Sequence, residues 1–277
     1  MGFSINNTGT LGMNNQLNST NGIVKSSMQK IASGLNLNSA KDDASAYAIS
    51  ISMSAEARSL AQANQNTQTS NAMMSVASGA ISSTTESLSS LKEKLLNAAN
   101  GTNNDSDISA LQNEVDQVTA QVNDNASVTF NGKYLIDGSM SGSNASNVQG
   151  SQGSDAKLSI GDITAAGLGL QDENGTSTID LSSSEGIANA IDLVDKAMQS
   201  TLSQQSQIGA QQQTLQYSSD NYTTSEYNTT AAQSTIADAD VAKESMKMHQ
   251  GQILAQANIL MMVQANQNHS GVLALLR

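Results

Sequence analysis

Aliphatic residues recur at helical spacing along most of the chain. The amino-terminal part carries one apolar stripe with mainly 4-3-4 spacing, as expected for one face of a helix. Its members are Met13, Leu17, Val24, Met28, Ile31 and Leu35. Further on, Ser39 followed by Asp42 resembles an N-cap with an acid in the first turn. We therefore predict that the helix breaks there and that a new one starts near residues 40–44.

The next predicted helix is long and has heptad spacing. Its 3-4-3-4 positions are Met74, Ala77, Ile81, Thr84, Leu88, Leu91 and Leu95. Helices with this spacing supercoil around one another. We predict a helix over residues 44–99, ended by the turn residues 100–104. A third helix follows, capped by residues 105–107, with a seam at Ile108, Leu111, Val115, Val118 and Val122.

The spacing becomes strand-like after residue 127. Residues 128–130 and 133–136 flank Asn131-Gly132, a pair typical of a type I′ hairpin turn. Residues 138–156 are rich in Gly, Ser and Asn and predict a loop. The pairs Leu158/Ile160 and Ile179/Leu181 alternate with polar residues and predict a second pair of strands.

Another long helix is predicted from about residue 185, after a capping-box pattern at residues 182–185. Every seventh residue from Val194 to Ile236 is aliphatic, Thr or Tyr. The partner positions, such as Gln205 and Gln212, are polar. This seam therefore needs neighbouring helices to bury it.

The carboxyl-terminal region carries a last apolar stripe at Ile253, Ala257 and Leu260. Residues 261–263 make this helix apolar on more than one face, which is usual for an enclosed helix. Its methionines (Met246, Met248, Met261, Met262) suit an adaptable docking surface, although plain helical core is the favoured interpretation. Together the patterns predict a mainly α fold, an elongated antiparallel helical bundle or coiled coil with small β-hairpins in the middle segment.

Composition supports long helices and excludes several kinds of site. The 277 residues include no Pro and no Cys, and aromatic residues make up only 3%. Proline breaks helix interiors, so its absence fits uninterrupted helices. Without Cys there are no disulfides or thiolate metal ligands. With few aromatic residues to build a large core, an elongated bundle is favoured over a sphere.

Charge divides the chain into ends without carboxylates and an acidic middle. Residues 1–41 and 245–277 contain no carboxylate, whereas residues 101–195 carry 14 Asp or Glu against two Lys. This suggests ends that pack together and against copies of themselves. The net charge of −12 argues against nucleic acid as a partner. The longest strongly apolar run, residues 259–263, is far short of the ~20 residues of a membrane span.

The polar residues do not suggest an enzyme, a metal site or a cofactor site. The two histidines, His249 and His269, lack the spacing of a metalloprotease motif. Asp42-Asp43 could bind a cation, but a helix start explains them better. Residues 172–175 are too short for a calcium loop and predict a turn. The first residues lack the features of a secretory signal peptide, so none is expected.

At both ends the sequence resembles bacterial flagellin. In the amino-terminal part the resemblance rests on residues 33–44 (Ser-Gly-Leu-Asn-Leu-Asn-Ser-Ala-Lys-Asp-Asp-Ala), on 97–103 and on 130–135. In the carboxyl-terminal part it rests on residues 236–244, 253–258, 264–267 and 272–277. The resemblance implies a structural subunit that self-assembles into the extracellular flagellar filament used for motility, exported by the flagellar type III apparatus.

The resemblance also implies a domain plan. Residues 1–43 plus 236–277 would form a terminal coiled-coil core domain, 44–138 plus 182–235 a helical rod domain, and 139–181 a short variable surface insert. The terminal segments would be disordered in the free subunit and fold on assembly. Subunit packing in the core is expected at Val24, Met28, Ile31, Leu35, Ile253, Ala257, Leu260, Leu273 and Leu276. The rod seam is expected at Met74, Ile81, Leu88, Leu91, Leu95, Leu111, Val115 and Val118.

Further partners follow from the resemblance. They are identical subunits, a flagellar export chaperone, and filament cap and junction proteins. A host receptor that detects flagellins reads a rod patch that maps to Ser90, Glu93, Lys94 and Glu114. Here Ser90 replaces the usual Arg and Lys94 the usual Leu, so weak receptor activation is expected. Two alternatives stay open, a hook–filament junction protein and a secreted coiled-coil adhesin or enzyme outside the flagellum.

Overall fold

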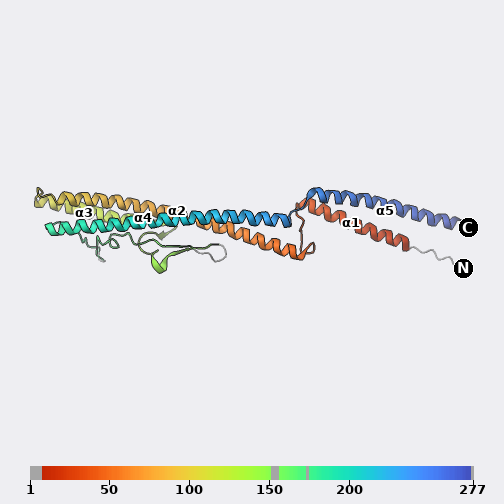
Figure 1. Ribbon diagram of the computed structural model, residues 1–277, viewed down its shortest axis with the longest axis horizontal. Coiled ribbons are helices and arrows are strands. Elements are labelled where there is room, and N and C mark those ends of the chain that lie inside the picture. Colours follow the sequence, from red (N-terminus) through yellow and green to blue (C-terminus); the bar gives the residue numbers. More distant parts are fainter. Residues whose placement is uncertain (1–7, 151–155, 173–174, 276–277) are drawn as a thin grey trace. The chain divides into compact units, whose positions relative to one another are not determined.

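The structure is a computed structural model that describes residues 8–150, 156–172 and 175–275. It is mainly α, as predicted (Figure 1). Contacts divide the chain into two compact units, which we call the terminal unit (Met1–Ala57 and Tyr227–Arg277) and the central unit (Arg58–Glu226). The helices are α1 (Thr8–Ser33), α2 (Ala44–Ala98), α3 (Asp105–Ala126), α4 (Ser184–Ala237) and α5 (Val241–Leu275).

The central unit is built around the heptad seam of α2. Figure 1 shows α2, α3 and α4 running side by side in this unit. All seven predicted α2 seam positions, from Met74 to Leu95, are fully buried. Facing them are buried residues of α3 (Val115, Val122) and of α4 (Val194, Ile208). Burying aliphatic side chains in this way is the main source of stability in such a bundle.

The starts of α2 and α4 differ in detail from the prediction. Asp43, not Ser39, caps α2, because its carboxylate accepts hydrogen bonds from the N–H groups of Ser45 and Ala46, both at 3.0 Å. The Ser39 and Asp42 pair instead closes a turn in the preceding loop. At α4, the Ser183 hydroxyl accepts from the Gly186 N–H at 3.1 Å, so the cap lies one residue later than predicted.

The start of α3 has a complete capping box. The cap residue is Asn104, whose side chain accepts hydrogen bonds from the N–H groups of Ser106 and Asp107. The Asp107 carboxylate in turn accepts from the Asn104 N–H at 3.1 Å. This reciprocal pair satisfies donors that a helix start leaves unpaired.

The predicted hairpin after α3 is confirmed. Strands β1 (Thr129–Phe130) and β2 (Lys133–Tyr134) pair antiparallel. Asn131 and Gly132 between them have φ angles of 50° and 76°. Positive φ at both central residues is the signature of a type I′ turn.

The second predicted strand pair is wrong. Leu158 belongs to β4 (Ala156–Leu158), and β4 pairs with β3 (Ser146–Val148), which lies in the segment predicted as loop. A short 3-10 helix, η1 (Gly142–Asn144), precedes β3. Ile179 and Leu181 are held instead by a side chain of α3. Gln112 donates to the Ile179 carbonyl and accepts from the Leu181 N–H, both at 3.0 Å.

The described parts of residues 139–181 lie along the helices of the central unit (Figure 1). Gln211 of α4 donates to the Ser159 backbone carbonyl at 3.0 Å, and the side-chain oxygen Oδ1 of Asn123 of α3 accepts from the Ala165 N–H at 2.9 Å. The buried apolar residues of this segment join the same core as the helix seams. They are Met140, Val148, Leu158, Ile160, Ile163, Ala165, Leu168, Leu170, Ile179 and Leu181.

The terminal unit pairs α1 with α5. The loops next to these helices are joined by backbone hydrogen bonds. Asn36 N–H donates to the Ala237 carbonyl at 2.7 Å, and Ala239 N–H donates to the Gly34 carbonyl at 2.9 Å. Gly34 has a φ of 71°, a conformation that glycine adopts at low cost. These bonds fix where the two helices begin their contact.

Candidate assembly surface

The seam between α1 and α5 has heptad spacing, but its fully buried residues are small or polar. The least exposed residues of α1 are Met13, Leu17, Thr20, Val24, Ser27 and Ile31. Those of α5 are Glu244, Met248, Gly251, Ala255, Asn258, Met262 and Ala265. Both sets follow 4-3 spacing, as in a coiled coil. Its large aliphatic members Leu17, Val24 and Ile31 are only half-buried, so this seam buries its apolar side chains less completely than the α2 seam.

A buried carboxylate fixes the register of this helix pair. Glu244 of α5 is only 5% exposed. It accepts a hydrogen bond from the Ser27 hydroxyl of α1 at 2.9 Å and pairs with Lys247 at 2.6 Å. The hydrogen bond from Lys247 lowers the pKa of Glu244 below its usual value, and Ser27 adds to this against the opposing effect of burial. The carboxylate therefore remains charged inside the seam at neutral pH.

A close contact at Gly251 fixes the helix separation. A Cβ placed on Gly251 would lie 2.7 Å from Cγ2 of Val24. Real Cβ atoms do not come so close to another carbon. Only glycine therefore lets α1 approach α5 at this point.

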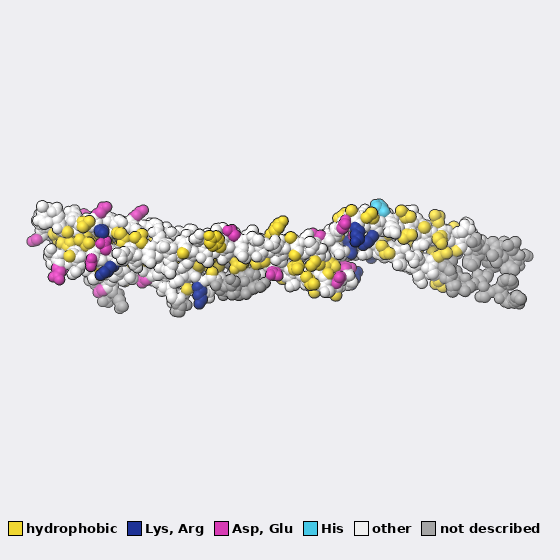
Figure 2. Space-filling model, in the orientation of Figure 1, with side chains coloured by type: hydrophobic (Ala, Val, Ile, Leu, Met, Phe, Trp, Pro, Cys, Tyr) yellow, Lys and Arg dark blue, Asp and Glu magenta, His cyan; other side chains and the backbone are white. Residues whose placement is uncertain are grey.

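The opposite face of α5 carries an exposed apolar stripe. Met246, Ile253, Ala257 and Leu260 lie two residues out of step with the seam, which places them about 200° around the helix. Met246 and Ile253 are each 67% exposed and Leu260 is 70% exposed. We call these four residues the outer stripe. Figure 2 shows hydrophobic side chains on the surface of the described part of this helix pair.

The residues predicted for core packing thus occupy different environments. Val24 and Ile31 are half-buried in the α1–α5 seam, whereas Met28 and Leu35 are exposed. Ile253, Ala257 and Leu260 belong to the outer stripe. The Leu273 side chain and all of Leu276 lie outside the described residues.

Sequence reasoning chose Met28 because it is apolar, but the seam passes through Ser27. Thr20 and Ser27 are 1% and 2% exposed, and their polarity hid the heptad spacing that includes them.

The predicted rod-seam residues lie together in the central unit. Six of them are fully buried, and Leu111 and Val118 are half-buried. Sequence reasoning did not foresee how the polar positions of α4 are used. Gln205 donates to Ser82 and Gln212 donates to Ser75, both at 3.1 Å, across to α2. These hydrogen bonds satisfy amides that would otherwise weaken the seam.

The four residues of the predicted receptor patch lie on α2 and α3. Lys94 forms an ion pair with Glu114. Ser90 and the exposed Glu93 line one surface hollow of about 420 Å³. The Glu114 carboxylate is therefore already paired within the chain.

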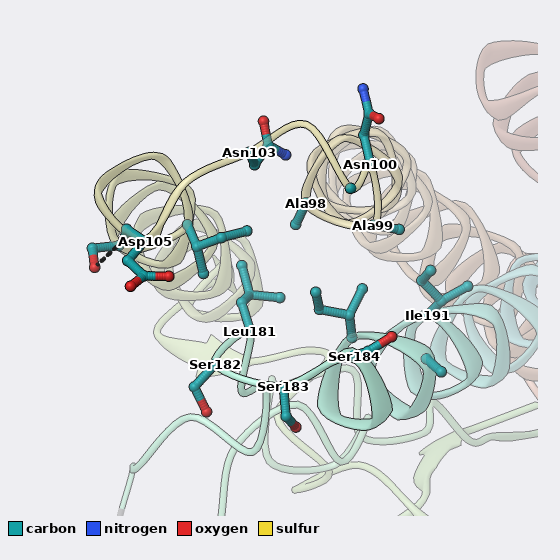
Figure 3. Close-up of a pocket in the computed structure, with 15 residues that line it drawn as sticks. Ala98, Ala99, Asn100, Asn103, Asp105, Leu181, Ser182, Ser183, Ser184 and Ile191 are labelled. Atoms are coloured by element: carbon teal, nitrogen blue, oxygen red, sulfur yellow. Dashed lines mark hydrogen bonds between the residues drawn. The ribbon is translucent and has the colours of Figure 1, made fainter.

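A larger hollow of about 660 Å³ lies where α2 ends and α3 and α4 begin (Figure 3). Its wall is partly apolar, with Ile108, Leu181 and Ile191, and Figure 3 shows Ser182, Ser183 and Asp105 at its edge. The lining contains a single titratable side chain, Asp105. This arrangement provides no pair of groups for general acid–base chemistry.

The remaining candidate features are the two histidines, possible metal ligands and possible membrane spans. His249 is exposed on α5, and the side chain of His269 lies outside the described residues. Among the residues that the structure describes, no cluster of His, Asp or Glu could hold a metal ion. Within the same residues, every helix is too short or too polar to cross a membrane.

Comparison with known families matches both parts of the chain. Residues 5–141 match the bacterial flagellin N-terminal helical region, and residues 191–276 match the bacterial flagellin C-terminal helical region. The segment between the two matches holds η1, β3, β4 and the start of α4.

Individual relatives agree with this match. Flagellin of Bacillus subtilis is 33% identical, with 98% of each chain covered. The flagellar filament 33 kDa core protein of Treponema phagedenis is 32% identical, over 94% of this chain and 95% of the relative. A Vibrio parahaemolyticus structure, provisionally described as a flagellar hook-associated protein, shares the fold alone, with a TM-score of 0.60, 17% identity, and coverage of 71% of this chain and 100% of that one. The chain therefore belongs to the bacterial flagellin family, the structural subunits of the extracellular flagellar filament.

Proposed function

We propose that the outer stripe of α5 is the surface through which terminal units of this flagellin pack against one another in the filament. The carrying observation is that α5 is apolar on two faces while α1 covers only one of them. Ile253 and Leu260 stay two-thirds exposed although α5 is already paired. Burying an aliphatic side chain of this size contributes about 1.5–3 kcal/mol, so repeated contacts of this kind favour a polymer.

The charges of the terminal unit support this role. The terminal unit holds six acidic and six basic residues, whereas the central unit holds 18 acidic and six basic ones. Beyond Glu244, α5 contains no carboxylate. Beyond Glu244, copies of this helix can therefore approach one another without repulsion between carboxylates. The acidic central unit, which carries the net charge of −12, favours contact with water.

The second part of the proposal is that the α1–α5 pair is weak in the free subunit. It is supported by the seam, whose fully buried residues are small or polar. Such a seam offsets little of the backbone entropy lost on ordering, about 1–2 kcal/mol per residue. The helix pair is then marginal in the free subunit and becomes stable when the outer stripe is covered. Backbone hydrogen exchange in α1 and α5 should be fast in the subunit and slow in the filament. Equally slow exchange in both states would contradict this part.

The domain plan forms part of the proposal. Residues 1–43 and 236–277 would act as the filament core, 44–138 and 182–235 as the rod, and 139–181 as the outermost segment. The helix breaks support these limits, since α1 ends at Ser33 and α4 ends at Ala237. Ten buried apolar residues in the described part of 139–181 support the idea that this part is fixed to the rod.

The decisive experiment compares polymerisation of the full chain with that of the double variant Ile253→Gln/Leu260→Gln. Gln favours helix almost as well as Leu, so α5 should remain helical. The control is Gln252→Ala, an exposed polar position on the same helix. Electron microscopy should show long tubes from the parent and the control and none from the double variant. Normal tubes from the double variant would rule out the outer stripe as the contact.

The same stripe would serve the partners that handle the free subunit. Before assembly, an export chaperone would cover Ile253 and Leu260, and filament cap and junction proteins would meet the terminal unit at the filament ends. An exposed aliphatic face in a free subunit supports a chaperone, since such a face otherwise promotes aggregation. The double variant should then also lose chaperone binding in a pull-down, and the Gln252→Ala control should keep it.

The patch on α2 and α3 supports weak activation of the flagellin-detecting host receptor. Lys94 places a charge where an apolar contact is expected. It also forms an ion pair with Glu114, so the Glu114 carboxylate already has a partner within the chain. The double change Ser90→Arg/Lys94→Leu should therefore raise activation in a reporter assay at least about tenfold. Lys196→Leu, which removes an exposed lysine of α4, is the control. Full activation by the unmodified protein would refute the idea.

A further inference from the structure

The exposed methionines gather on the two terminal helices. The chain has 12 Met and no Cys, so thioethers are the only sulfur groups that an oxidant can attack. In the central unit Met74 and Met140 are buried. Among the methionine side chains that the structure describes, three are exposed. They are Met28 of α1 (53%) and Met246 and Met261 of α5 (67% and 55%).

Met246 is part of the outer stripe proposed for subunit contact, and the other two lie at exposed positions of the same pair of helices. Met261 follows Leu260 directly and lies seven residues after the exposed Leu254, on the same side of α5. Met28 is next to the seam residue Ser27 but points outward. Flexible thioethers pack well against irregular apolar partners, and a sulfoxide does not.

We infer that Met28, Met246 and Met261 are oxidation sites that control whether the free subunit can polymerise, with hydroperoxides such as hydrogen peroxide as the oxidant. This inference rests on the proposed role of the outer stripe. Conversion to sulfoxides turns an apolar contact surface polar, and the oxidised subunit is excluded from the growing filament. A subunit already in the filament is protected, because its neighbours cover the sulfur atoms.

The reaction is a two-electron oxygen transfer. A sulfur lone pair attacks one peroxide oxygen, an S–O bond forms and the O–O bond breaks. The second oxygen leaves with both hydrogens as water. Sulfur is oxidised by two electrons and the peroxide is reduced by two. Methionine sulfoxide reductases reduce the sulfoxide back to methionine, so the oxidation is reversible and can act as a switch.

The first test maps oxidation residue by residue. Free subunits and filaments are treated with the same dilute hydrogen peroxide, and peptides are analysed by mass spectrometry. In free subunits Met28, Met246 and Met261 should oxidise at least about tenfold faster than Met74 and Met140, because reaction follows exposure. In filaments this preference should vanish. Equal rates for the three sites in both states, or faster oxidation of Met74, would overturn the inference.

The second test measures assembly. Peroxide-treated subunits should need a critical concentration roughly tenfold higher, because burying an unpaired polar group disfavours contact. Treatment with methionine sulfoxide reductases should restore assembly. The variant Met28→Leu/Met246→Leu/Met261→Leu should assemble with or without peroxide. Loss of its assembly after peroxide would show that other methionines carry the effect.

Each remaining outcome is also decisive. If the triple variant does not assemble at all, reductase treatment of the oxidised parent provides the test. Restored assembly would support methionine oxidation as the cause, and no restoration would overturn the inference. Oxidised parent protein that assembles normally would overturn the inference and leave the outer-stripe proposal intact. Untreated parent protein that never assembles would instead refute the proposed function, and the peptide map would still test the three sites.

Discussion

In the central unit, α2 presents large aliphatic side chains that are fully buried within the same chain. In the terminal unit, the α1–α5 seam is built from residues such as Thr20, Ser27 and Gly251, while Ile253 and Leu260 stay exposed. The same heptad spacing therefore has two uses. One seam completes a core inside a single molecule. The other aligns two helices and leaves large apolar side chains of α5, such as Ile253 and Leu260, exposed.

Under the proposed function, this difference lets one subunit fold when free and still bind its neighbours. The central unit would supply a folded body to the free subunit. The terminal unit, with its weaker internal seam, would gain stability from neighbouring copies. The comparison predicts that mutations in the two units will have their effects in different states of the protein.

The largest expected effect is a core truncation in the central unit. Leu88 is fully buried in the α2 seam, so Leu88→Ala should lower the free energy of unfolding by about 2–5 kcal/mol. Denaturant unfolding of the free subunit measures it. Leu260→Ala is the matched control, since the same truncation at an exposed site of α5 should change subunit stability little.

The comparison between the two units would fail if Leu260→Ala lowered the free energy of unfolding as much as Leu88→Ala does. A Leu260→Ala variant as unstable as Leu88→Ala would show that the outer stripe is already buried in the free subunit. In that case α5 would have no free apolar face to offer to other copies.

A smaller effect is expected from the closest contact in the terminal unit. Gly251→Ala puts a methyl group 2.7 Å from Val24, and the overpacking should weaken the α1–α5 pair by about 1–3 kcal/mol. Gly22→Ala in α1 is the control, because nothing lies within 4 Å of its Cβ position. That change should stabilise the helix by up to about 1 kcal/mol.

Hydrogen exchange of peptides from α1 measures both changes. Exchange should become faster in Gly251→Ala and slower in Gly22→Ala. Slower exchange in both variants would mean that α1 and α5 do not approach closely in the free subunit.

The sequence predicted the parts of the fold in which local and tertiary signals agree. Helix α2 was expected over 44–99 and spans Ala44–Ala98, because its heptad spacing over residues 74–95 is continuous and no proline interrupts the residues before it. The β1–β2 hairpin followed from Asn131-Gly132, whose backbone preferences define the turn almost alone.

The sequence was misleading where side chains from distant segments decide the structure. Strand β3 carries a single buried residue, Val148, in a Gly-, Ser- and Asn-rich stretch, so no alternation marks it. Ile179 and Leu181 alternate like a strand, yet Gln112 of α3 takes the place of a partner strand. Local spacing cannot reveal such a contact.

The candidate site shows the same limit. The apolar stripe of α5 was visible in the sequence, but the seam of α1 was misplaced by one residue at position 28. Apolar residues mark a seam only when apolar contacts form it. Here a buried carboxylate and a glycine set the register, and neither belongs to a hydrophobic pattern.

The smallest expected effect concerns the buried carboxylate of Glu244. Its pH dependence separates the terminal unit from the central unit. The pKa of Glu244 is held below its ordinary value of 4.5 in the folded protein, mainly by Lys247, with Ser27 and Lys30 of α1 adding to this. Its stabilisation is therefore fully present above pH 4.5 and is lost as pH falls from there through the folded pKa. Glu244→Gln should cost the α1–α5 pair about 1 kcal/mol at neutral pH, since Lys247 is half-exposed and its charge is screened. The protection of α1 amides, measured as exchange rates corrected for the intrinsic pH dependence of amide exchange, should then fall on acidification in the parent and less so in the variant. Glu93→Gln, at an exposed site of the central unit, should behave like the parent. An identical acid response in Glu244→Gln and the parent would show that this carboxylate does not hold the two helices in register.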